Sequence, residues 1–152
     1  MNSYPDGLPA HRNRNVHWRM DGAAYFVTWR TREHAPELDE YEREMIHENL
    51  KYFHGTRYRL YALVVMNDHV HVIVQPLADN QLSKIVQGWK SYTAHKIQSR
   101  RGSSGSLWQK DYHDRIIRSV SNLYSIAEYI VNNPLERWPG QTEYRWVEWF
   151  EM

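Results

Sequence analysis

Four stretches of the chain alternate apolar with polar positions or concentrate β-branched and aromatic residues, as β-strands do. The first reads AAYFVTWRT, and the third, HVHVIVQ, follows the second after the turn-forming pair Asn67-Asp68. Because that connection is short, we expect the second and third strands to form an antiparallel hairpin. The four expected strands are residues 23–31, 59–66, 69–75 and 111–118.

Three other stretches place apolar residues three or four positions apart, which is the period of an amphipathic helix. Gly55 follows the first of them as a stop signal, and Asn133-Pro134 is expected to end the third. The expected helices are residues 38–53, 81–99 and 122–132. Residues 138–150 are rich in tryptophan and have no clear period.

The elements follow one another as strand, helix, strand, strand, helix, strand, helix. This order predicts the α+β class and a ferredoxin-like sandwich, in which helices pack on one face of an antiparallel four-stranded sheet. We expect three segments: a polar N-terminal arm over residues 1–20, a folded domain over residues 21–137 and a C-terminal tail over residues 138–152.

The composition is that of a globular protein, with 41% hydrophobic residues and no cysteine among 152 residues. A chain of this length fits one domain with its own hydrophobic core. The lack of cysteine excludes disulfides, thiolate nucleophiles and thiolate metal sites. No apolar run approaches the length of a membrane span and no secretory signal is visible, so we expect a cytoplasmic protein with no membrane partner.

Charge is unevenly distributed, although the formal net charge is only +1. Residues 80–118 carry eight basic and two acidic side chains, whereas residues 32–48 carry seven acidic and two basic ones. One face is therefore expected to be basic enough to bind phosphates. The competing interpretation is that these charges form the solvated faces of ordinary helices.

The strongest candidates for chemistry are His69 and His71. Side chains alternate along a strand, so both imidazoles share one face, and the valines between and after them share the other. The valine face suits the core. The two histidines then lie about 7 Å apart at Cα, close enough to converge on one divalent ion. Nine histidines in 152 residues make this spacing a weak signal by itself, and the alternative is two structural histidines hydrogen-bonded over the sheet.

Tyr129 and Asn133 lie four residues apart in the third expected helix and share one face of it. If that face packs over the histidines, the Asn133 oxygen can become a further metal ligand and Tyr129 can reach a bound phosphate. Two imidazoles and a neutral oxygen suit Mg²⁺ or Mn²⁺. Such an ion would favour the phenolate, which is scarce at pH 7 because tyrosine has a pKa of about 10. Spacing does not single out Tyr129 among eleven tyrosines, and Tyr112 is a second candidate.

Several segments together resemble the IS200-like single-tyrosine HUH transposases, and most closely the REP-associated tyrosine transposases. AAYFVTWRT resembles the first strand of that family, and YALVVMNDHVHVIVQP resembles its two-histidine hairpin. LWQKDYHDRIIR and AEYIVNNP resemble its fourth strand and its tyrosine helix. The likeness covers residues 20–138 in order. Its specificity comes from the histidine hairpin and the Tyr-x-x-x-Asn-Pro segment taken together.

This resemblance implies roles that spacing leaves open. His69 and His71 match the metal-binding pair, Asn133 matches a polar third ligand and Tyr129 matches the nucleophile. Members of the family nick and rejoin single-stranded DNA through a 5′-phosphotyrosine with a free 3′-OH, and the REP-associated branch recognises palindromic hairpins. The resemblance therefore implies a metal-dependent DNA endonuclease and strand transferase at the nucleoid. The REP-associated branch is monomeric and the IS200 branch dimeric, so we expect a monomer, with a dimer as the alternative.

Basic and amide side chains outside this centre are the candidates for holding DNA. The polar arm supplies side chains that suit groove edges and phosphates, and the second expected helix supplies cations. Trp89, Tyr92 and Trp108 can stack unpaired bases, although we expect Trp89 and Tyr92 to be core residues of their helix. The expected DNA-binding residues are Arg12, Asn13, Arg14, Lys84, Lys90, Arg100 and Arg101.

Two other functions remain open at this point. One is a hairpin-binding module without cleavage activity, which would have no use for two histidines, a tyrosine and an asparagine in this arrangement. The other is a small metal-dependent hydrolase that uses the same histidines. It is disfavoured because no acidic metal ligand stands at a fixed offset from them.

Overall fold

One antiparallel sheet organises residues 22–150, the part of the chain that the computed structural model describes. The strands are β1 (Tyr25–Arg30), β2 (Tyr58–Val65), β3 (His69–Pro76), β4 (His113–Ile116) and β5 (Val147–Trp149). Their order across the sheet is β4-β1-β3-β2-β5, and every neighbouring pair is antiparallel. The helices are α2 (Glu40–Lys51), α3 (Leu82–Arg101) and α4 (Val120–Arg137).

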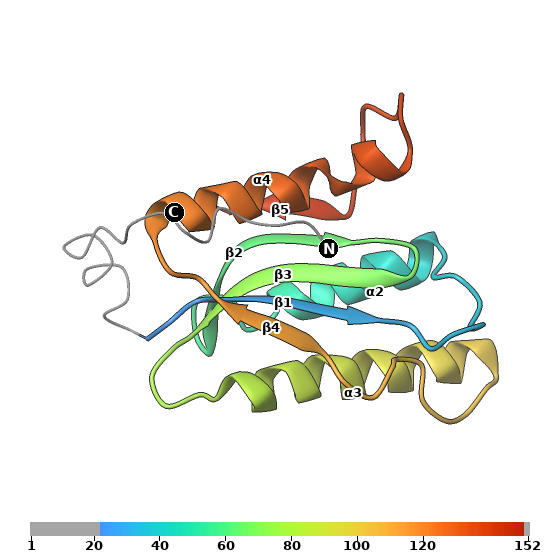
Figure 1. The fold of residues 1–152 in the computed structure, drawn as a ribbon. Coiled ribbons are helices and arrows are strands. Elements are labelled where there is room, and N and C mark those ends of the chain that lie inside the picture. Colours follow the sequence, from blue (N-terminus) through green and yellow to red (C-terminus); the bar gives the residue numbers. More distant parts are fainter. Residues whose placement is uncertain (1–21, 151–152) are drawn as a thin grey trace.

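The α+β class, the antiparallel sheet and the β-α-β-β-α-β order are confirmed, and two details differ from the expectation. The sheet has a fifth strand, β5, within the residues expected to form a tail; three residues are too few to show a period. The helices also cover both faces, with α4 on the side opposite α2 and α3 (Figure 1). The reason is that both faces of the sheet are apolar, so each needs cover.

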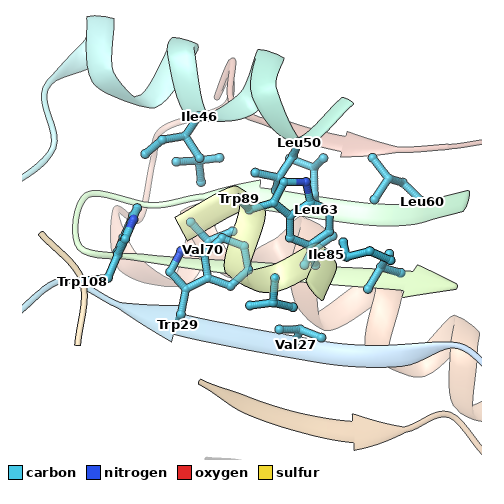
Figure 2. Packing of buried hydrophobic residues seen from close by; sticks show 14 of the residues in the cluster. Val27, Trp29, Ile46, Leu50, Leu60, Leu63, Val70, Ile85, Trp89 and Trp108 are labelled. Carbon is cyan, nitrogen blue, oxygen red and sulfur yellow. The ribbon is translucent and has the colours of Figure 1, made fainter. Parts of the chain in front are cut away.

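The face under α2 and α3 carries the larger core (Figure 2). The three β3 valines and Trp29 of β1 point into it. The Trp29 ring stacks on Trp89 of α3 at 5.7 Å between centroids and meets Trp108 edge-on at 6.0 Å. The valine face of the histidine strand is therefore the core face, as its alternation predicted.

Trp29→Ala is expected to lower the free energy of unfolding by about 3–5 kcal/mol, because the side chain is 1% exposed and its loss opens a cavity between two other indoles. Urea denaturation measures the change. Leu135→Ala is the control, since Leu135 is 51% exposed, and it should cost about 0.5 kcal/mol or less. Equal losses in the two variants would contradict this description of the core.

Helix α4 begins at a side-chain cap, where Ser119 accepts from the Asn122 N–H, and it runs through Pro134 to Arg137. The expectation that Asn133-Pro134 ends this helix is therefore wrong. An interior proline costs about 3 kcal/mol, and burial of the apolar α4 face, Pro134 included, offsets that cost. As a consequence, Asn133 lies inside the helix, and residues one turn before it share its face.

Within residues 22–150, none of the helices combines the length and the apolar character needed to cross a bilayer.

Candidate active site

His69 and His71 lie on the face of β3 that α4 covers. Ile73 continues this face and belongs to the core cluster that includes Ile126 and Ile130 of α4. The His71 residue is 2% exposed and the His69 side chain is 12% exposed. The centroids of the two rings are 4.6 Å apart, so the imidazoles converge as their alternation on the strand predicted.

Thr28 of β1 holds the His71 ring. The antiparallel register places Thr28 opposite His71, and the distance between Thr28 Oγ1 and His71 Nδ1 is 2.7 Å. With Nδ1 engaged by the hydroxyl, Nε2 is the nitrogen that His71 can offer to a metal ion. Sequence reasoning missed Thr28, because Thr28 and His71 are 43 residues apart and the register that pairs them leaves no local signal.

Asp68 plays the corresponding part for His69. Its Oδ1 lies 2.7 Å from His69 Nδ1, and because a carboxylate only accepts, this nitrogen carries the proton in the neutral ring. His69 Nε2 is then an acceptor, and it faces Asn133 Oδ1 of α4 at 3.3 Å. Two acceptors that face each other at this distance are stabilised by a cation that both can bind. Carboxylate-anchored histidines are typical of metal sites.

The donor set fits a hard divalent ion that keeps several waters. Within residues 22–150, no group of three or more His, Cys, Asp or Glu side chains is placed to hold a metal ion. A metal here would thus use two imidazole nitrogens and the neutral oxygen of Asn133. This combination suits Mg²⁺ or Mn²⁺ and lacks the thiolates of a structural zinc site.

Both histidines are held in the neutral form that a metal ligand needs. Burial lowers the pKa of His71 well below 6.5, and the neighbouring His69 and Arg30 lower it further. Burial also lowers the pKa of His69, while the hydrogen bond to Asp68 acts in the opposite direction. Neither ring therefore needs to lose a proton at neutral pH before it can bind a cation.

Acid is expected to destabilise the metal-free protein through His71. The unfolded chain takes up this proton as the pH falls through about 6.5, whereas the folded protein does so only at its lower pKa, so the free energy of unfolding decreases between the two values. Urea unfolding at about pH 7.5 and about pH 5.5 measures the effect. The free energy of unfolding should decrease less in His71→Gln than in the parent protein. An identical decrease in both proteins would show that His71 is not the source of the pH dependence.

Tyr129 approaches the histidines from α4. Its ring centroid is 5.6 Å from that of His71 and 6.3 Å from that of Phe26, both in edge-on contacts. Burial raises the pKa of the half-buried phenol, and Glu136 adds to this, while Arg30 lowers it. Tyr129 is thus protonated at neutral pH, and a cation beside it would favour the phenolate.

Arg30 is a residue that sequence reasoning missed. The register places it opposite His69, and strand alternation puts it on the same face of β1 as Thr28. It is exposed, and its charge lowers the pKa of His69, His71 and Tyr129. A guanidinium at this edge of the site can bind a phosphate oxygen.

Tyr112 does not share this site. It packs against the core cluster on the α2 and α3 side of the sheet, and Lys90 Nζ lies 6.0 Å from its ring centroid. Of the two tyrosines considered from the sequence, the fold brings Tyr129 to the histidines.

The expected DNA-binding residues that the structure describes lie away from the histidines. Arg12, Asn13 and Arg14 fall outside the described residues, and the other four are on α3, across the sheet from the histidines. Lys90 Nζ donates to the carbonyls of residues 109 and 110, both at 2.9 Å. Contact of these side chains with DNA remains a prediction.

The two arginines among them also join α3 to the start of α2. Arg101 donates to both carboxylate oxygens of the buried Glu42, at 2.8 and 2.9 Å, and Arg100 pairs with Asp39 at 2.9 Å. Asp39 and Glu42 form the capping box of α2. Replacing either arginine would therefore disturb the contact between the helices as well as any contact with DNA.

Comparison with known proteins identifies relatives of this chain. A family model described as "Transposase IS200 like" matches residues 20–133 of the 152. No curated protein matches the chain.

Two solved structures share the fold. One is a REP-associated tyrosine transposase bound to a REP hairpin, with a TM-score of 0.67 and 20% identity over 84% of this chain and 76% of that one. Another, a Deinococcus radiodurans protein assigned as a transposase, has a TM-score of 0.50 and 23% identity over 72% of this chain and 88% of that one.

Proposed function

The chain belongs to the family of IS200-like transposases, and from this premise we propose that it nicks and rejoins single-stranded DNA beside hairpins, with Tyr129 as the nucleophile. The observation that carries the proposal is the convergence of α4 on β3. Asn133 Oδ1 lies 3.3 Å from His69 Nε2, and the Tyr129 ring lies 5.6 Å from the His71 ring. These distances support the proposal because the candidate nucleophile and the three candidate metal ligands lie close together.

In the proposed reaction, the Tyr129 oxygen attacks the phosphorus of a DNA phosphodiester. A bond forms between that oxygen and phosphorus, the bond from phosphorus to the 3′-oxygen breaks, and the proton lost by the phenol is matched by the one gained at the 3′-OH. The 5′-phosphotyrosine keeps the energy of the phosphodiester, so the 3′-OH can reverse the step and rejoin the strand.

Each side chain of the site has a defined task. His69, His71 and Asn133 would hold the divalent ion, Mg²⁺ or Mn²⁺, which when bound polarises the phosphate and favours the phenolate. Asp68 and Thr28 keep the two imidazoles oriented.

The guanidinium of Arg30 lies at the edge of the site. Arg30 can bind a non-bridging phosphate oxygen, which would orient phosphorus toward Tyr129 and stabilise the charge of the transition state. Hairpin DNA is proposed as the substrate because the REP-associated transposase with the same fold is bound to a REP hairpin. We propose action as a monomer at the nucleoid.

A covalent adduct tests this function directly. The full chain is incubated with pooled hairpin oligonucleotides carrying single-stranded flanks, with Mg²⁺ or Mn²⁺ and separately with EDTA, and the products are analysed by mass spectrometry. The expected result is a phosphotyrosine at Tyr129 that forms only with metal. A gel shift of the hairpin without any adduct would support a hairpin-binding protein without cleavage activity instead. An adduct on another residue would identify that residue as the nucleophile in place of Tyr129.

A further inference from the structure

A groove of about 640 Å³ lies between α2 and α3, on the face of the sheet opposite the histidines. Its floor is apolar, with Ile85 and Trp89 of α3 and Met45 of α2. At Gly88 of α3 a Cβ would meet no atom within 4 Å, so this glycine leaves space open.

Two exposed tyrosines flank this groove. Tyr52, at the C-terminal end of α2, is 76% exposed, and Tyr92 of α3 is 50% exposed. The expectation that Trp89 and Tyr92 are both core residues is thus correct for Trp89, which is 4% exposed, and wrong for Tyr92. The buried stripe of α3 runs through Ile85, Trp89, Thr93 and Ile97, and Tyr92 lies beside this stripe, at the solvent edge of an amphipathic helix. Exposed aromatic faces on either side of a hollow are the arrangement that stacks unpaired bases.

Cations continue the line of the groove along α3. Lys84, Gly88, Tyr92 and Lys96 recur every four residues and therefore form one stripe of the helix. Lys96 Nζ lies 5.9 Å from the Tyr92 ring centroid, and Lys84 lines the groove. With a rise of 1.5 Å per residue, the two lysines are about 18 Å apart, which spans several nucleotides.

We propose that this groove is a second binding site for single-stranded DNA, which stacks an unpaired base on Tyr52 and Tyr92 and places backbone phosphates on Lys84 and Lys96. Charge favours this occupant over an apolar segment of protein. Arg57 also lines the groove, with its guanidinium 3.6 Å from the Phe53 ring centroid, while Glu48 is the one acidic side chain among the lining residues in the described part of the chain. Cations in line with an exposed aromatic ring match a chain of phosphates and bases.

The groove would bind single-stranded DNA, which is also the substrate class of the proposed function on which this inference rests. Binding in the groove does not require cleavage of the DNA. The groove lies across the sheet from Tyr129, so it would hold a flank of the substrate while the nucleophile acts on another segment. Binding can therefore be measured in EDTA with an oligonucleotide that has no hairpin.

Gly88→Leu is the decisive variant. It fills the groove from a position with open space, and leucine is a better helix former than glycine, so the variant is expected to fold. The probe is oligo-dT labelled with fluorescein, and anisotropy in EDTA gives its Kd. Gly88→Leu and Tyr92→Ala are each expected to raise the Kd about tenfold or more. Lys84→Gln should lower the slope of log K against log salt by about one unit.

Tyr124→Ala is the matched control, because Tyr124 is an exposed tyrosine (48%) on α4, on the other side of the sheet. It should leave the Kd unchanged. The proposed binding of DNA in the groove would be contradicted if Gly88→Leu kept the Kd of the parent protein, or if Tyr124→Ala raised the Kd as much as Gly88→Leu does. Lack of an adduct at Tyr129 together with the expected Kd changes would overturn only the proposed function, and an adduct with unchanged Kd values would overturn only the groove.

Discussion

Tyr129→Phe is expected to abolish cleavage of a hairpin oligonucleotide, with a rate loss of about 10⁴-fold or more, because the substitution removes the phenol oxygen that we propose forms the phosphotyrosine. Binding of the same oligonucleotide should change little, since the ring and its edge-on contacts with His71 and Phe26 are kept. A denaturing gel of a labelled strand measures cleavage, and a native gel measures binding.

The control for this variant is Tyr112→Phe. Tyr112 packs on the opposite face of the sheet, so its hydroxyl should be dispensable for cleavage. If Tyr129→Phe still cleaves and Tyr112→Phe does not, the nucleophile is Tyr112 and the proposed role of Tyr129 is wrong.

The second large effect is expected from His71→Gln. We expect loss of metal-dependent cleavage by about a hundredfold or more, because even outer residues that orient metal ligands cost tenfold to a hundredfold when replaced. Isothermal titration with Mn²⁺ should show the matching loss of metal affinity. Thr28→Val, which removes only the hydroxyl partner of His71 Nδ1, should give a smaller loss in the same direction.

His47→Gln is the control for a general effect of removing a buried histidine. His47 is 9% exposed, lies on α2 and pairs with Glu148 at 3.2 Å, away from β3. It should keep both metal affinity and cleavage. Full cleavage by His71→Gln, or an equal loss in His47→Gln, would show that the histidine pair does not form the metal site.

Much of the fold could be predicted from the sequence because the relevant signals are local. The pattern of apolar residues located seven of the eight elements that residues 22–150 form, and alternation along β3 separated the valine face from the histidine face. The four-residue spacing of Tyr129 and Asn133 likewise predicted their shared helix face. The missed strand, β5, is too short for any period, and the continuation of α4 through Pro134 depends on burial that no local signal records.

The sequence by itself thus determined most of the elements, which residues share a face of each of them, and the side chains that are candidates for chemistry. Only the tertiary structure decided which faces meet. It placed α4 over the histidines, set Thr28 and Arg30 opposite His71 and His69, and separated Tyr112 from the site. The physical reason is that periodicity arises within one helix or strand, whereas register and the choice of sheet face arise from packing between segments far apart in the chain.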